Sequence, residues 1–412
     1  MRECHGLYLP VTNTTKCSEC GLCARCCPGS EVNFDELNFK IFGQKPKNTL
    51  LGNYLQCYVG HSTDEGIRYN SSSGGVVTQL LIYALDTHLI DGALVVRMSK
   101  EKPLEPEVFI ARTKDEITSS SKSKYCPVSI DAGLAEILRE NGRFAVVGLP
   151  CHIQGIRKAQ LVDKRLSEKI VFIIGLFCAR ETSFEGTRFF LKSIKAPISA
   201  IKQIDYRGKG WPGGMTITFK NGAEKFIPFA EYRTILGSLF FTPQRCFLCC
   251  DPLNELADIS VGDAWLSKFS NDTYGKSMLI SRTKGMEETL KHAILDNTIK
   301  LNQLKPQEVI SSQRKLLRFK KEELCNRFSV WYFLGKPVPH FGNITCNHSS
   351  FVNRLLLSSN AATYYTIITI FSKQGKLSNL FLFCFGLSEK LIIKSLRFQY
   401  KASPYWNTKS LV

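Results

Sequence analysis

The cysteine spacing near the N-terminus constrains this chain more than any other feature. Residues 17–28 read Cys-Ser-Glu-Cys-Gly-Leu-Cys-Ala-Arg-Cys-Cys-Pro. Cys17, Cys20, Cys23 and Cys27 therefore follow the spacing C-x2-C-x2-C-x3-C-P. In that spacing a tight loop wraps thiolates around an iron–sulfur cube, and the proline turns the chain away. We predict a 4Fe-4S site formed by these four cysteines.

The fourth ligand of this site stays open on sequence alone. In two-cluster ferredoxins the last cysteine of such a run serves the other cluster, and this chain has no second run. Either Cys27 closes the cluster, or a remote thiol such as Cys4 or Cys57 completes it; a 3Fe-4S form is also open. Cys26 is interpreted as a bystander. Zinc is the alternative metal, although four-cysteine zinc sites usually use two separated C-x2-C pairs.

The abundance of cysteine also bears on the cellular compartment. The chain has 16 cysteines in 412 residues, yet its start has no apolar segment of the signal-peptide kind. Clustered cysteines in a cytoplasmic chain point to metal binding or redox chemistry rather than to disulfides. The net charge of +18 favours anionic partners. A zinc-dependent nucleic-acid binder is disfavoured, because the paired cysteine and histidine spacing of zinc fingers is missing.

After residue 50 the sequence changes to alternating helical and strand patterns. Apolar periodicity predicts helices over 76–85 and 130–140, strands over 93–96, 144–148 and 169–176, and a hairpin over 215–222. Strands that alternate with helices indicate an α/β core with a largely parallel sheet. Binding residues of such sheets gather at the carboxyl ends of the strands. Cys151 and Cys178 each follow such an end.

A second, dispersed set of cysteines accompanies this core. Cys151 and Cys178 are joined by the C-x2-C pair Cys246 and Cys249, which gives four thiols, enough for one more cubane. Taken singly, Cys151 and Cys178 are as well explained as buried structural thiols. Arg245, beside the pair, is positioned to lower thiol pKa values and to donate to cluster sulfurs, or simply to form a surface ion pair.

A third group contains no cysteine. Arg68, the small residues 71–75 and the tripeptide 123–125 precede or adjoin predicted helices. Glycine and serine that open a helix present free backbone N–H groups to a phosphate, and a nearby cation neutralises it. Tyr125 could pack on a planar ring. A plain helix cap explains the serine–glycine stretch equally well.

The order of these motifs resembles the coenzyme F420 hydrogenase/dehydrogenase beta-subunit family, preceded by a ferredoxin-like segment. The matching stretches are 72–78 with Arg68 before it, 90–93, 123–125, 146–155, 245–249 and 257–265. One departure lies at the inner cysteine, where Leu149 and His152 replace the Thr and Gln of the usual Gly-Thr-Pro-Cys-Gln pattern. The resemblance spans about residues 50–315.

The resemblance implies an FAD-containing α/β flavoprotein with an iron–sulfur cluster close to the flavin. It makes Cys151, Cys178, Cys246 and Cys249 the ligands of that inner cluster. It also assigns the flavin surround, which comprises Arg68, Ser73, Gly74, Gly75, Thr78, Ser123, Lys124, Tyr125, Gly148 and Pro150. His152 and Lys124 are the candidates for proton transfer. No nucleophile is required.

The implied function is hydride exchange between FAD and coenzyme F420, or a related two-electron substrate, with electrons passed singly along the clusters to a protein partner or subunit. The alternative is a non-catalytic iron–sulfur relay subunit without flavin. The expected organisation is a ferredoxin-like segment (1–45), an N-terminal beta-subunit domain (50–125), a C-terminal one (126–315) and a helical basic tail (316–412). Residues 377–401 of the tail mix apolar and basic side chains, which makes peripheral membrane contact a hypothesis beside packing on the core.

Overall fold

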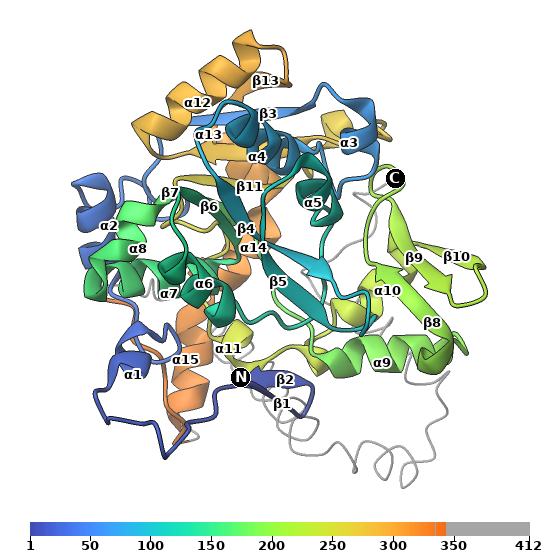
Figure 1. The fold of residues 1–412 in the computed structure, drawn as a ribbon. Helices are drawn as coiled ribbons and strands as arrows, with labels where there is room; N and C mark the ends of the chain where they lie inside the picture. Colours follow the sequence, from blue (N-terminus) through green and yellow to red (C-terminus); the bar gives the residue numbers. More distant parts are fainter. Residues whose placement is uncertain (334, 343–412) are drawn as a thin grey trace, which may run out of the picture.

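The computed structural model describes residues 1–333 and 335–342 and is built on one large sheet (Figure 1). The order of its eight strands is β13 (Ile299–Leu304), β3 (Gln56–Ser62), β12 (Ser277–Ser281), β11 (Ile259–Asp263), β7 (Ile170–Leu176), β6 (Phe144–Gly148), β4 (Gly92–Met98) and β5 (Pro106–Ala111). The α/β prediction is confirmed, but the expectation of a largely parallel sheet is wrong. Only β11, β7, β6 and β4 run parallel, and every flanking strand is antiparallel.

Helices cover both faces of this sheet. One face is buried under α4 (Val76–Asp86), α5 (Lys114–Ser119) and α12 (Lys284–Leu295), with α3 (Glu65–Tyr69) beside them. The other face is buried under α2 (Phe34–Phe42), α6 (Asp131–Arg139), α7 (Pro150–Val162) and α8 (Lys164–Lys169). Both apolar faces of the central strands are thus removed from water, as parallel strands require. The predicted helices and strands of the core are confirmed.

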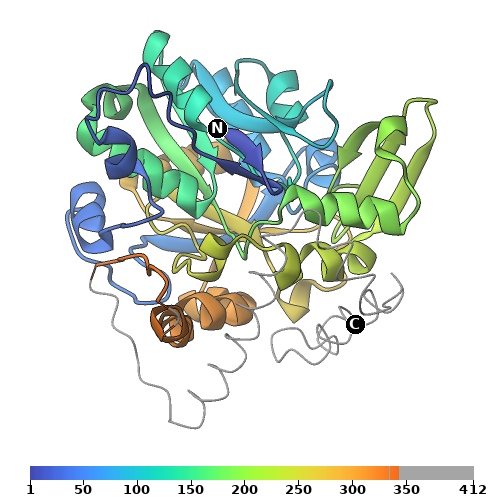
Figure 2. The same ribbon diagram turned by 90° about the horizontal axis from the view of Figure 1, so that it is seen from below.

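A smaller unit lies at one side of the large sheet in both views (Figures 1 and 2). It comprises the antiparallel strands β8 (Ile201–Asp205), β9 (Gly214–Phe219) and β10 (Glu224–Pro228), with α9 (Phe184–Ser193), α10 (Phe229–Leu236) and η1 (Ile198–Ala200). The predicted hairpin is confirmed, and the amide of Phe219 donates to the carbonyl of Ala223 at 2.8 Å across its turn. This unit has its own apolar core.

The two ends of the described chain pack onto this framework. The N-terminal part forms the hairpin β1 (Arg2–Cys4) and β2 (Leu7–Leu9), and then α1 (Leu22–Cys26). Short elements η2 (Leu239–Phe241), α11 (Gln244–Phe247) and η3 (Ser267–Phe269) carry the loops after α10 and β11. The C-terminal part continues through α13 (Pro306–Ser312), α14 (Arg314–Leu317), the π-helix η4 (Arg318–Glu322) and α15 (Leu324–Phe333).

The C-terminal helices cover the loop that carries Cys246 and Cys249. Phe247, Leu248 and Trp331 form one apolar cluster, against which Phe319 and Phe328 pack. No helix within 1–333 or 335–342 has the length and apolarity to cross a bilayer. The stretch 377–401, for which membrane contact was a hypothesis, lies outside the described residues.

Candidate redox site

The carboxyl ends of three neighbouring parallel strands form the base of the site. β6 ends at Gly148 beside Gly175 of β7, and β11 pairs with β7 on its other side. A cavity of about 800 Å³ lies along these ends and extends to the smaller sheet unit. This volume falls within the usual range for cofactor sites, and the edge is the expected one for an open α/β sheet.

Backbone and side-chain contacts bring the loop 249–254 across these strand ends. Asn254 donates to the carbonyls of Gly148 (2.9 Å) and Leu176 (3.4 Å), and so bridges two strands. A Cβ on Gly175 would stand 2.3 Å from Cγ of Asn254, so only glycine fits there. The amide of Cys178 donates to the carbonyl of Pro252 at 2.9 Å. The C-x2-C segment is thereby held against the residues that follow β6 and β7.

The four thiols of the dispersed set converge on one region. Cys151 lies in the first turn of α7, Cys178 follows β7, Cys246 lies on α11, and Cys249 follows α11. Cys151 is within electrostatic range of Cys178, Cys246 and Cys249. The amide of Glu181 donates to Sγ of Cys246 at 3.4 Å. Sequence positions up to 98 apart thus supply one group of partly buried thiols.

The chemistry of this thiol group fits an iron–sulfur cluster. Burial raises the pKa of each of Cys151, Cys178 and Cys246, the last to about 12, and the neighbouring thiols raise these pKa values further. Like thiols crowded together in this way are stabilised as thiolates by a bound metal. Among the described residues no three Cys, His, Asp or Glu side chains gather tightly enough for a single metal ion. A cubane cluster differs from a single ion, because its four cysteine ligands bind different corners of the cube and therefore lie farther apart.

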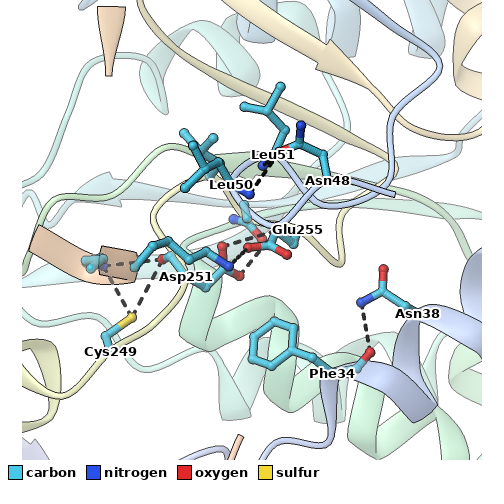
Figure 3. Close-up of polar contacts among 12 residues, drawn as sticks. Phe34, Asn38, Asn48, Leu50, Leu51, Cys249, Asp251 and Glu255 are labelled. Atoms are coloured by element: carbon cyan, nitrogen blue, oxygen red, sulfur yellow. Dashed lines mark hydrogen bonds and ion pairs between the residues drawn. The ribbon is translucent and has the colours of Figure 1, made fainter. Parts of the chain in front are cut away.

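A buried lysine lies among these thiols, and sequence reasoning missed it. Lys320 is 1% exposed, and its Nζ donates to Sγ of Cys249 at 3.2 Å and to the carbonyl of Asp251 at 3.3 Å. Figure 3 shows Cys249 beside Asp251, with Glu255 beyond them. Burial raises the pKa of Cys178 and of Cys246, and the positive charge of Lys320 opposes part of that increase. No signal in the sequence distinguished Lys320 from the other lysines of the basic tail.

The N-terminal cysteine segment docks on the same helix that carries Cys151. Lys158 of α7 donates to the carbonyls of Cys27 (3.0 Å) and Glu31 (2.7 Å). A Cβ on Gly155, also of α7, would stand 3.6 Å from Cδ of Pro28. The two predicted cluster sites therefore lie on neighbouring parts of one surface.

Within that segment the four predicted ligands are exposed, whereas Cys26 is partly buried. Backbone hydrogen bonding at Leu22 lowers the pKa of Cys20. The remote candidates differ: Cys57 is buried in an apolar cluster of β3, where burial raises its pKa to about 11, and Cys4 lies exposed on β1. Cys57 is therefore poorly suited to complete an N-terminal cluster.

Most of the residues assigned to the flavin surround line the cavity. These are Ser73, Gly75, Thr78, Ser123, Lys124, Tyr125 and Gly148. Gly74 is packed against β3, since a Cβ there would stand 2.4 Å from the carbonyl oxygen of Gly60, and Pro150 is buried at the start of α7. Arg68 pairs with Asp272 at 2.9 Å and does not line the cavity.

Arg207 is a cavity residue that sequence reasoning missed. Its side chain is buried and donates to the carbonyl of Ser72 (2.6 Å) and to the hydroxyl of Tyr125 (3.2 Å), and it pairs with Asp263 at 3.4 Å. Its guanidinium also lies 4.5 Å from the ring centroid of Phe229. Arg207 thus joins the serine stretch, the 123–125 loop and the end of β11. It follows β8, outside every motif that the sequence reveals.

The two candidates for proton transfer have different roles in the fold. Burial lowers the pKa of Lys124 to about 7, and its ammonium donates to the carbonyls of Ser121 (2.7 Å) and Lys122 (2.9 Å). Burial lowers the pKa of His152 to about 4, so the ring is neutral at pH 7. The amide of Leu149 donates to Nδ1 of His152 at 3.3 Å. A glutamine at the same helix position could accept that bond, which explains how His152 substitutes for the usual residue.

The sequence and the fold both match known proteins. Family models for the N-terminal and C-terminal parts of the coenzyme F420 hydrogenase/dehydrogenase beta subunit match residues 57–135 and 141–307. The coenzyme F420 hydrogenase subunit beta of Methanothermobacter thermautotrophicus is 28% identical over 301 residues, which cover 71% of this chain and 100% of that protein. The coenzyme F420-dependent sulfite reductase of Methanocaldococcus jannaschii is also 28% identical, over 76% of this chain but only 51% of that protein.

One solved structure shares the fold. A chain of the F420-reducing [NiFe] hydrogenase complex from Methanosarcina barkeri, solved as a xenon derivative, superimposes with a TM-score of 0.55 at 24% identity. The match covers 71% of this chain and 97% of that chain. At this identity the likeness concerns the fold alone.

Proposed function

The chain belongs to the coenzyme F420 hydrogenase/dehydrogenase beta-subunit family, and on that premise we propose that it is an iron–sulfur flavoprotein oxidoreductase. It exchanges a hydride between FAD and coenzyme F420, or a related two-electron substrate, and passes electrons through 4Fe-4S clusters. The relatives named for coenzyme F420 support this substrate class.

One observation carries the proposal: the four dispersed thiols converge beside the large cavity, and Cys178 is part of both. Cys178 lines the cavity, as does Glu181, whose amide contacts Cys246. A ligand in the cavity would therefore stand next to the group held by these thiols. This arrangement suits a cofactor that exchanges electrons with a cluster.

The cavity wall has the charge and shape for a flavin dinucleotide. Lys and Arg side chains outnumber carboxylates in its lining, although Lys122, Arg207 and Arg314 pair with Asp205, Asp263 and Glu322. The basic side chains are Lys122, Lys124, Arg180, Arg207, Arg233, Arg314 and Lys315. This balance suits a pyrophosphate. When bound, a flavin supplies the conversion between two-electron and one-electron transfer. Tyr125, Phe229 and Trp265 supply aromatic surface for its rings, and Arg207 holds the wall around them in place.

The N-terminal segment would provide the second site, nearer to solvent. Its docking on α7 through Lys158 keeps Cys27 beside the helix whose first turn carries Cys151. Arg245 lies between the two sites, because its Nη1 is 3.6 Å from the position of a Cβ on Gly29. Electrons would leave through this exposed segment to a protein partner or another subunit, in the cytoplasm.

Anaerobic purification with iron, sulfide and flavin quantified together tests the proposal. We expect both clusters, one FAD, and flavin reduction when reduced coenzyme F420 is added. Clusters without flavin would identify an electron-relay subunit instead. Zinc without acid-labile sulfide would reject the redox function, and flavin that no deazaflavin reduces would reject the substrate.

A further inference from the structure

Lys320 is unusual among the described lysines because its buried ammonium contacts a thiol. The described residues place no carboxylate within 4.0 Å of its Nζ, whose partners are Sγ of Cys249 and the carbonyl of Asp251. The next residue, Lys321, forms an ion pair with Glu255. An ammonium taken out of water without a counter-charge is strongly unfavourable. The thiol group beside Lys320 is where that counter-charge can arise.

The local backbone conformation sets the directions of the Lys320 and Lys321 side chains. Residues 318–322 form a π-helical turn, closed by a hydrogen bond of 2.9 Å from the amide of Glu323 to the carbonyl of Arg318. Single π-helical turns occur often at functional sites because they redirect side chains. Here the turn directs Lys320 into the thiol group. Glu255, the partner of Lys321, belongs to the loop that follows Cys249.

Lys320 acts on the thiol group through Cys249, whose Sγ its Nζ contacts directly. The amide of Cys249 donates to the carbonyl of Cys246 at 3.4 Å, so these two cysteines share one short segment. The amide of Cys178 donates to the carbonyl of Pro252 at 2.9 Å, which holds Cys178 against the same loop. The ammonium therefore lies at the thiol group, in direct contact with one of its members. A cluster held by four thiolates is anionic, and it gains a further negative charge on reduction.

We propose that Lys320 is a positioning residue that holds a fixed positive charge on Cys249 and thereby raises the reduction potential of the inner cluster. The inference rests on the proposed function, since it requires a cluster on Cys151, Cys178, Cys246 and Cys249. It involves one electron added to the cluster, no bond made or broken, and no proton moved. Lys320 lies beyond residue 307, where the family match ends, so the C-terminal segment tunes a site that the family domains build.

The test compares the full chain with Lys320→Met, Lys320→Arg and the surface control Lys268→Met, each loaded anaerobically and titrated with dithionite. We expect Lys320→Met to lower the equilibrium constant for one-electron reduction at least tenfold, which is about 59 mV. Lys320→Arg and Lys268→Met should stay within threefold. Equal potentials in wild type and Lys320→Met would overturn the inference, whereas a wild type that holds no cluster would overturn the proposed function.

The metal-free protein provides a second measurement, which does not require Lys320→Met to load. Without a cluster the buried ammonium lacks its anionic partner, so we expect Lys320→Met to melt at the same temperature as wild type or higher. A melting temperature several degrees lower would show that Lys320 serves packing, and would overturn the inference.

Discussion

Nζ of Lys158 donates a hydrogen bond of 3.0 Å to the carbonyl oxygen of Cys27, and this bond joins the N-terminal cysteine segment to the helix whose first turn carries Cys151. The same Nζ donates to the carbonyl of Glu31 at 2.7 Å. One half-buried lysine therefore binds both ends of the turn that follows the cysteine run.

Replacing Lys158 with Met should loosen this segment without unfolding the core. Loss of two hydrogen bonds from this half-buried ammonium costs about 1 kcal/mol, so amide hydrogen exchange over residues 23–32 should quicken by roughly fivefold. Lys164→Met, an exposed change on the next helix, is the control. Unchanged exchange in Lys158→Met would show that apolar contacts alone hold the segment.

Substitution of an inner thiol should cost the protein a cluster, whereas substitution of the neighbouring Cys250 should not. Cys246→Ser should lose iron and sulfide equivalent to one cluster, because serine is a poor substitute for thiolate. Cys250 is 1% exposed within an apolar cluster, so Cys250→Ala should keep its full iron content. Quantifying iron and sulfide in both variants checks this prediction, and equal loss in the two would contradict the assigned ligand set.

The outer segment allows a matched pair of variants. Cys27→Ser should remove or convert the outer cluster, whereas Cys26→Ser should leave it intact, because Cys27 has the motif spacing and an exposed thiol. Electron paramagnetic resonance of the reduced proteins distinguishes a lost cluster from a three-iron form. If Cys26→Ser has the larger effect, Cys26 rather than Cys27 is the fourth ligand of the cluster, and the prediction is wrong.

Arg207 lines the cavity and Arg68 does not, so substitutions at these two positions should affect FAD binding differently. Arg207→Met removes the link between Ser72, Tyr125 and Asp263, and we expect FAD to bind at least about tenfold more weakly. Arg68→Met breaks a pair with Asp272 away from the cavity lining and should leave the affinity within about threefold. Fluorescence titration of the flavin-free proteins measures both, and equal effects would reject this division.

The low pKa of His152 predicts a pH-dependent loss of stability. The unfolded histidine takes up a proton below about pH 6.5, whereas the folded one does so only near pH 4, so stability falls as the pH drops between these values. The slope due to His152 is at most about 1.4 kcal/mol per pH unit, because the folded and unfolded states differ by at most one proton at this ring.

Two variants isolate this effect. His152→Gln keeps an acceptor for the Leu149 amide and should match wild type at pH 7, then become the more stable protein as the pH falls toward 4. His152→Leu should be destabilised by about 1 kcal/mol at pH 7, because the helix cap is lost. Parallel pH profiles for wild type and His152→Gln would refute the assignment.

Sequence patterns located the parts of the site that follow strand ends. Cys151 and Cys178 come directly after two apolar runs, and parallel pairing of β6 with β7 makes their ends adjacent. The flanking antiparallel strands were not predicted, because short apolar runs do not reveal the direction of the neighbouring strand. β3 and β12 pair across more than 200 residues, a relation that local periodicity cannot carry.

The missed side chains share a physical cause. Lys320 and Arg207 lie in segments without a motif, and only tertiary packing buries them against the site. Arg68, which is assigned to the flavin surround beside a serine–glycine stretch, pairs with Asp272 from a distant loop. The nature of a cation's partner depends on contacts between remote segments, which a single sequence does not encode in its spacing.

The unequal exposure of the two cysteine sets has a consequence for oxidation of the protein by dioxygen. The outer set is exposed to solvent; it comprises Cys17, Cys20, Cys23 and Cys27. The inner thiols are partly buried, and α15 covers the residues around Phe247. Dissolved dioxygen would therefore reach the N-terminal set directly and the inner set chiefly by way of the cavity. Oxidative damage would begin at the proposed electron exit, and a filled cavity would delay its spread inward.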